Sequence, residues 1–144
     1  MRVVWHAELP YHCIMPLGHK LDTREVVTPA DLAGAPIIGF ADTTVTGVQL
    51  DQLTAALPDP PVVRMRVHLS ASASRLVSEG HWLAVVDPFA AASHARAGGI
   101  SRPFESPARF NIFLVVREHV PLSDAVAAFI ARFDERVSAL LMLL

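Results

Sequence analysis

One short stretch, WLAVVDP at residues 82–88, is the most informative part of the sequence for the fold. Its first five residues are apolar, and a run of this length is typical of a buried strand. Asp87 and Pro88 follow at once, and these residues are favoured as the N-cap and the first residue of a helix. We therefore predict a buried strand that leads directly into a helix over residues 89–96, which is the βα unit of an α/β fold.

The same alternation of short apolar runs and helix-period segments extends in both directions. We predict further strands at residues 9–15, 36–40, 62–67, 100–104 and 110–116, and helices at residues 28–34, 48–57, 70–80 and from 121 onward. The last helix carries an apolar stripe at three- and four-residue steps, formed by Val126, Phe129, Ile130, Phe133, Val137, Leu140, Leu141 and Leu144. This order of elements predicts an α/β domain with a parallel or mixed sheet.

Composition narrows the class of protein. The chain has 144 residues, of which 52% are hydrophobic and 18% charged, so it can form one compact domain or two small lobes with a sizeable core. Its net charge is −2 and its basic residues are scattered, which argues against nucleic-acid binding by this stretch alone. The single cysteine, Cys13, rules out an internal disulfide. The sequence also lacks a signal-peptide pattern and a membrane-length apolar run, so we expect a cytoplasmic protein.

Catalytic and metal-binding patterns are missing from the sequence. None of the seven histidines is spaced three or four residues from another, as a zinc site on one helix requires. No phosphate loop, nucleophile elbow or dinucleotide fingerprint occurs. Cys13 lies within an apolar segment, where a thiol is usually inert packing. We therefore expect no catalytic residue, no metal site and no cofactor.

Candidate ligand contacts follow the ends of three predicted strands. They are Thr43, Thr44 and Thr46 after residue 40, His68 and Ser70 after residue 67, and Asp87 and Pro88 after residue 86. In a parallel arrangement these ends share one edge of the sheet, where open α/β sheets bind ligands, and helix N-termini there suit a carboxylate. Ordinary roles stay open as well. Asp87 is more simply a helix cap, Ser70 fits a cap or a ligand contact equally, and the threonines fit a plain surface loop.

Four motifs, in this order, resemble the regulatory domain of LysR-type transcriptional regulators. They are CIMPLGHKL at residues 13–21, VTPADLAGAPII at 27–38, LVSEGHWLAVVDP at 76–88 and the helix at 122–133. Lys20 stands where the family's first motif has proline, and Trp82 stands where the third has its second glycine. The VVDPF ending at residues 85–89, with the RPF downstream, is most similar to the branch that senses opines and related amino acids.

The resemblance implies a periplasmic-binding-protein-like fold of type 2, in which two α/β lobes joined by crossing strands hold an effector between them. Residues 1–34 would then be a crossing strand and hinge region, 35–105 the second lobe, and 106–144 the return strand and last helix of the first lobe. The strands at 9–15 and 110–116 would cross the hinge. Most of the chain would be the second lobe, and only one wall of the effector cleft would be present.

The resemblance further implies a sensor and not an enzyme. A small carboxylate or amino-acid-like effector would bias a homo-oligomer, a dimer or tetramer, between DNA-bound arrangements. We expect an N-terminally truncated regulator, so DNA would be bound only through a helix-turn-helix domain that this chain lacks.

Three other classes of protein remain open at this point. A periplasmic-binding-protein-like small-molecule binder with a transport role would carry a secretion signal. An enzyme of related fold acting on amino acids would need a general base, for which only Asp87 or His68 could serve. A purely oligomerising fragment would show self-association without a ligand response.

Overall fold

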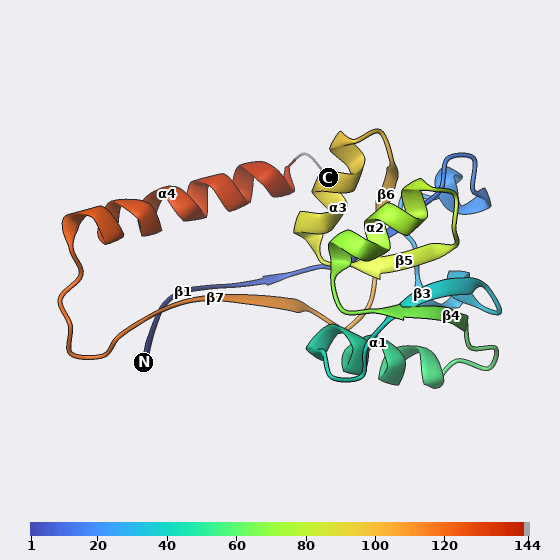
Figure 1. The fold of residues 1–144 in the computed structure, drawn as a ribbon, viewed down its shortest axis with the longest axis horizontal. Coiled ribbons are helices and arrows are strands. Elements are labelled where there is room, and N and C mark those ends of the chain that lie inside the picture. The colour runs from blue at the N-terminus through green and yellow to red at the C-terminus, as the bar shows by residue number, and fades with distance from the viewer. Residues whose placement is uncertain (143–144) are drawn as a thin grey trace.

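The computed structural model describes residues 1–142, and within them the chain forms a mixed α/β structure with two separate sheets (Figure 1). The strands are β1 (Arg2–Leu9), β2 (His12–Met15), β3 (Pro36–Phe40), β4 (Val62–Val67), β5 (Leu83–Val86), β6 (Ile100–Pro103) and β7 (Phe110–Val116). The helices are α1 (Val45–Ala55), α2 (Ser70–Ser78), α3 (Pro88–Arg96) and α4 (Asp124–Leu141), with short 3-10 turns η1 (Lys20–Thr23) and η2 (Pro29–Leu32). The predicted α/β class is confirmed; Leu144, the last member of the predicted stripe, lies outside the described residues.

The larger sheet has the strand order β4-β3-β5-β2-β6. β3 pairs parallel with β4 and β5, whereas β2 pairs antiparallel with β5 and β6, so the sheet is mixed. All residues of β2 and β5 are buried. Alternate residues of β2 face different cores: Cys13 packs in the core that Leu50 and Leu53 of α1 adjoin, and Ile14 packs in the core formed with α2 and α3. Helices therefore cover both faces of this sheet (Figure 1).

The smaller sheet is an antiparallel ribbon of β1 and β7, which pairs Leu9 with Phe110 and Arg2 with Val116. The ribbon and α4 extend together away from the larger sheet (Figure 1). Trp5 of β1 joins them, because its ring meets Phe133 of α4 edge-on at 5.0 Å and its Nε1 donates a hydrogen bond of 2.9 Å to an Asp134 carboxylate oxygen.

The predicted single strand at residues 9–15 is wrong, because this segment is divided between the two sheets. β1 ends at Leu9, and β2 begins at His12. Pro10 between them has no N–H to give to a ladder, so pairing stops there. The first seven residues of β1 were not predicted as a strand. Since β2 lies inside the five-stranded sheet, residue 34 marks no break in the sheet, and the division of the chain into lobes remains a prediction.

Most other elements lie close to their predicted positions. The strands predicted at residues 36–40 and 62–67 are β3 and β4. α1 begins three residues earlier than predicted, because the Thr44 hydroxyl accepts a hydrogen bond of 3.0 Å from the Gly47 N–H and caps the helix. Within residues 1–142, none of the helices combines the length and the apolar character needed to cross a membrane.

Candidate functional site at the carboxyl edge of the larger sheet

The parallel strands of the larger sheet end at one edge. β3 and β4 align Phe40 with Val67, and β3 and β5 align Ile38 with Ala84, so the carboxyl ends of all three strands lie side by side. Helices α1, α2 and α3 begin shortly after these ends. The seven residues singled out from the sequence are thus carried on neighbouring segments. We call this edge, with residues 41–46, 68–70 and 87–88, the rim.

The threonines of the first rim segment are partly committed to local structure. The Thr44 hydroxyl donates to the Ala41 carbonyl at 2.8 Å while it caps α1. Thr46 Oγ1 lies 3.3 Å from the Tyr11 hydroxyl, and Thr43 is exposed to solvent. Only Thr43 therefore offers a side chain that these local interactions leave uncommitted.

Asp87 caps α3, as its ordinary interpretation predicts. Its Oδ1 accepts hydrogen bonds of 3.0 Å from the N–H groups of Phe89 and Ala90. Pro88 is buried as the first residue of the helix, where its fixed φ and missing N–H cost nothing. The N-terminus of α3 is thus already supplied with a negative charge by the chain itself.

The N-terminus of α2 differs from the other two. Its N-cap is Leu69 and not Ser70, for which a cap was one of the two roles left open by the sequence, and Leu69 has no side chain that can accept a hydrogen bond from the first turn. Ser70 is instead the first helical residue and is partly exposed, and His68 is exposed beside it. Among residues 1–142, the N–H groups of Ser70 and Ala71 have no hydrogen-bond partner, which is the ordinary state of an uncapped helix N-terminus. This end of the rim is therefore suited to an anionic acceptor.

Tyr11 contacts the rim at Thr46, and the sequence did not single it out. It is buried between β1 and β2, and its hydroxyl donates a hydrogen bond of 2.8 Å to Gln49 Oε1 of α1. Since the one hydroxyl proton points to Gln49, the Thr46 hydroxyl is the donor across the 3.3 Å contact. Burial raises the pKa of the Tyr11 phenol, the Thr46 hydrogen bond lowers it, and the Asp87 carboxylate raises it. The only sequence signal was a lone tyrosine beside Pro10, which we had placed inside one strand.

Aromatic contacts extend from Tyr11 across the connections between the sheets. Its ring meets Phe110, the first residue of β7, at 6.2 Å, and Phe110 meets Phe89 of α3 at 6.1 Å, both edge-on. Tyr11, between the sheets, and Phe110, at the start of β7, thus contact residues of α1 and α3.

The other polar groups near the rim include a buried thiol, hydroxyl groups and an exposed imidazole. Burial raises the pKa of the Cys13 thiol to about 12, so this thiol stays protonated and unreactive at neutral pH. Within the described part of the chain, no cluster of three or more His, Cys, Asp or Glu side chains could hold a metal ion. The rim itself presents hydroxyl groups, an exposed imidazole and helix N–H groups, which can hold and orient a small polar molecule.

Comparison with known sequences gives consistent matches over most of the chain. The family model described as "LysR substrate binding domain" matches residues 4–138. The chain is 32% identical over 117 residues to the transcriptional activator protein LysR of Escherichia coli strain K12, covering 81% of this chain and 38% of that protein. It is 29% identical over 131 residues to the regulatory protein NocR of Agrobacterium tumefaciens strain T37, covering 89% and 43% respectively. The chain thus spans about two fifths of the length of these curated relatives, which are named as regulators.

Solved structures show the same fold at low sequence identity. The effector binding domain of QuiR, in complex with shikimate, superposes with a TM-score of 0.60 at 20% identity, over 91% of this chain and 66% of that one. The PA01 protein of Pseudomonas aeruginosa, a putative LysR family transcriptional regulator, superposes with a TM-score of 0.63 at 14% identity, over 92% and 48%. The architecture is therefore that of a type 2 periplasmic-binding-protein-like effector domain.

Proposed function

Because the chain belongs to the LysR substrate binding domain family, we propose that it is the effector-sensing part of a bacterial transcriptional regulator and that its rim forms one wall of the effector cleft. The effector is a small carboxylate or amino-acid-like molecule. It acts by being bound and not by being turned over, so the protein is not an enzyme.

The uncapped N-terminus of α2 is the observation that carries this proposal. The helices that begin beside it are capped by Thr44 and Asp87, and α2 alone of the three rim helices begins without a side-chain cap. Free N–H groups and the positive end of the helix dipole favour an anion at this position. We assign a carboxylate of the effector to the N–H groups of Ser70 and Ala71, with the Ser70 hydroxyl and His68 beside it.

The other predicted contacts then serve the remainder of the effector. Thr43, Thr44, Thr46, Asp87 and Pro88 shape the adjoining part of the wall, and an ammonium group would suit the Asp87 carboxylate. A preference for opines or related amino acids remains a prediction.

The β1–β7 ribbon and α4 then belong to the first lobe, and residues 35–105 form most of the second. Closure of the two lobes on the effector would change the arrangement of a cytoplasmic, DNA-bound dimer or tetramer. DNA is bound through a helix-turn-helix domain outside this sequence.

Isothermal titration calorimetry of the 144-residue chain tests whether the N-terminus of α2 binds a carboxylate. The probes are the standard amino acids, succinate and shikimate. Ser70→Pro removes the Ser70 N–H at the first helical position, where proline is well tolerated after the extended Leu69. We expect Ser70→Pro to lower the affinity for the tightest-binding probe about tenfold. Ser70→Ala, which removes only the hydroxyl, should lower this affinity less.

Asp124→Pro is the matched control, because it makes the same change at the first residue of α4, far from the rim. It should leave the affinity unchanged. Two results would contradict the proposed carboxylate site at the N-terminus of α2. One is an affinity that Ser70→Pro does not lower, and the other is a chain that binds none of these probes.

A further inference from the structure

Leu69, the residue before Ser70, is unusual for its position in two respects. It is the N-cap of α2, where Ser, Thr, Asp or Asn normally accept hydrogen bonds from the first turn and where leucine is among the least favoured residues. Its side chain is also 66% exposed, so an apolar group lacks the burial that would stabilise it. Both costs are offset together if one molecule places an anion on the first turn and an apolar group on Leu69.

The rim segment beside Leu69 also exposes an apolar side chain. Val45, the first residue of α1, is 74% exposed. The two segments are neighbours, because the Ala41 N–H donates a hydrogen bond of 2.9 Å to the Val67 carbonyl. Both α1 and α2 begin at the end of the larger-sheet region that faces the ribbon (Figure 1). A molecule bound at this end of the region therefore meets apolar surface as well as hydroxyl and N–H groups.

The charges of the rim favour one carboxylate and disfavour a second. The three rim segments contain two aspartates, Asp42 and Asp87, but no lysine or arginine. Arg66 of β4, the nearest basic residue to Ser70 along the chain, is already bonded. Its Nη1 donates to the Phe40 carbonyl at 2.6 Å and lies 2.9 Å from an Asp51 carboxylate oxygen. A second carboxylate on the same molecule would therefore meet like charges at the rim and no guanidinium or ammonium group.

We propose that the rim selects a monocarboxylate with an apolar side group of about the size of a leucine side chain, and that Leu69 contacts this group. The inference rests on the proposed function, because it takes the carboxylate to lie on the N–H groups of Ser70 and Ala71. Leu69 directly precedes them, so the side group of an α-amino acid or a related acid lies within its reach. Contact there removes apolar surface from water on both partners, whereas a polar side group would lose its hydration without gaining a hydrogen bond.

Three amino acids of similar shape form a matched ligand series for isothermal titration calorimetry of the 144-residue chain. Leucine has an apolar branched end, asparagine has a polar end of similar size, and aspartate adds a second carboxylate. We expect leucine to bind about tenfold more tightly than asparagine, and aspartate to bind most weakly. Equal affinities, or tighter binding of asparagine or aspartate, would overturn this inference but leave the carboxylate site in place. Binding of none of the three would contradict the proposed function itself, and this inference with it.

Two leucine variants test the role of Leu69. Leu69→Ala keeps the first turn uncapped, since alanine is also a poor N-cap, so the carboxylate site should persist. We expect it to lower the affinity for leucine about fivefold and to leave the affinity for asparagine unchanged. An unchanged affinity for leucine, or an equal fall for both ligands, would overturn the contact with the side group.

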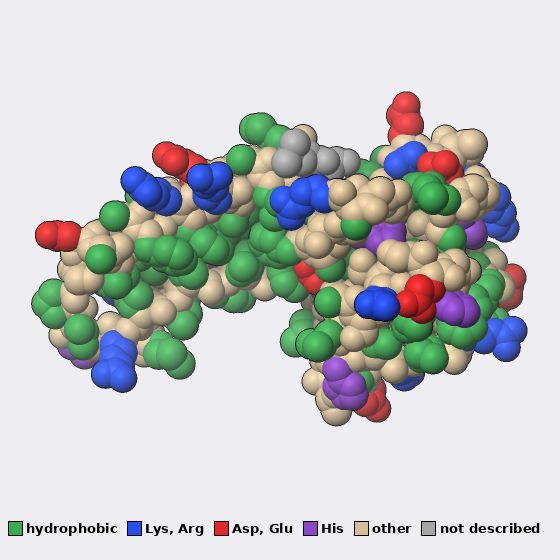
Figure 2. All heavy atoms as spheres, turned by 45° about the horizontal axis from the view of Figure 1, so that its top comes forward, with side chains coloured by type: hydrophobic (Ala, Val, Ile, Leu, Met, Phe, Trp, Pro, Cys, Tyr) green, Lys and Arg blue, Asp and Glu red, His purple; other side chains and the backbone are tan. Residues whose placement is uncertain are grey.

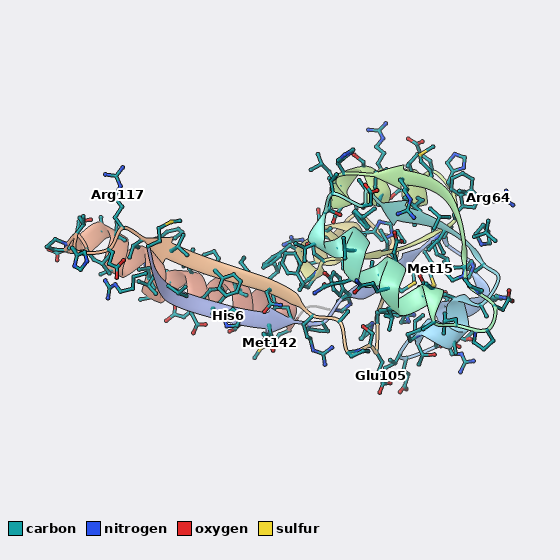
Figure 3. The ribbon with its side chains drawn as sticks, turned by 90° about the horizontal axis from the view of Figure 1, so that it is seen from below. His6, Met15, Arg64, Glu105, Arg117 and Met142 are labelled. Atoms are coloured by element: carbon teal, nitrogen blue, oxygen red, sulfur yellow. The ribbon has the colours of Figure 1, made fainter. Side chains whose placement is uncertain are left out.

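Leu17→Ala is the matched control. Leu17 is 77% exposed, but it follows β2, which runs antiparallel to β5 and so ends at the end of the larger sheet away from Asp87. Figure 3 labels its near neighbour Met15 within the sheet-bearing part of the molecule, away from His6 on the ribbon. Leu17→Ala should change neither affinity. A fall in the affinity for leucine as large as that of Leu69→Ala would overturn the assignment of the apolar contact to the rim.

Discussion

The central strands β2 and β5 of the larger sheet bury all of their residues, whereas the β1–β7 ribbon and α4 leave many apolar side chains exposed. Ile14 in the middle of β2 is 0% exposed, but Phe113 and Val115 of β7 are 52% and 51% exposed, and Phe129 of α4 is 57% exposed. Hydrophobic side chains accordingly gather on the surface of the extended part in Figure 2. Similar apolar patterns thus produce a complete core in one region and an open apolar surface in the other, so the two regions should differ in stability.

The largest expected effect comes from shortening a core side chain. Ile14→Ala removes three carbon atoms from a position packed on all sides, and we expect the free energy of unfolding to fall by about 2–5 kcal/mol. Val115→Ala on the ribbon should cost about 0.5 kcal/mol or less. Urea denaturation followed by circular dichroism measures both. A similar fall in the free energy of unfolding for the two variants would show that the ribbon packs as tightly as the sheet.

Helix caps in the two regions form the next comparison. Asp87 receives two hydrogen bonds of 3.0 Å at the start of α3, whereas Ser123 receives one of 3.3 Å at the exposed start of α4. Asp87→Ala should therefore lower the free energy of unfolding by about 1–2 kcal/mol and Ser123→Ala by about 0.5 kcal/mol. Thermal denaturation of the two variants shows which cap contributes more to the free energy of unfolding. A greater loss for Ser123→Ala would contradict a more stable sheet region.

Tyr11 lies where the two regions meet. Tyr11→Phe keeps the ring against Phe110 but removes the hydroxyl that bonds to Gln49. We therefore expect the free energy of unfolding to fall by about 0.5–1.5 kcal/mol. Trp5 reports the ribbon and Trp82 the sheet, so fluorescence of chains that keep one tryptophan follows each region separately. If Tyr11 links the regions, Tyr11→Phe should separate the two unfolding midpoints. Midpoints that remain together would show that the link lies elsewhere.

The effect of pH should be confined to the sheet region and should be the smallest. Burial lowers the pKa of both His12 and His94 below the ordinary value of 6.5. Below that pH the unfolded chain binds protons that the folded chain does not, so stability is full above about pH 6.5 and falls as the pH falls through this value. Urea denaturation at about pH 8 and about pH 5 measures the change, and His12→Asn should reduce it. Stability that rises on acidification would contradict this sign.

The local pattern of the sequence predicted much of the fold. β3, β4 and β5 lay where short apolar runs end at turn residues, and Asp87 capped its helix as its chemistry suggests. The boundary between β1 and β2 was not predictable in this manner, because an apolar run does not show that its two halves pair in different sheets. Pro10 was the available signal, and its missing N–H should have counted against a continuous strand.

The candidate site was predicted as a set of segments but not in its details. Three strand ends at one edge follow from parallel pairing, which the order of elements already favoured. That Leu69 and not Ser70 takes the cap of α2 depends on backbone angles that no residue type fixes. The bond from Tyr11 to Gln49 joins residues 38 positions apart, so it was not visible in the sequence.

Backbone amide chemical-shift mapping of the chain during a titration with small carboxylates tests the central claim most directly, because each residue reports separately. We predict the largest shifts at the amides of Ser70 and Ala71, smaller shifts at His68 and in residues 41–46, and little change at the ribbon. Shifts that centre on other residues, or no saturable shift with succinate, shikimate or any amino acid, would contradict the assignment of the rim as the effector-binding wall.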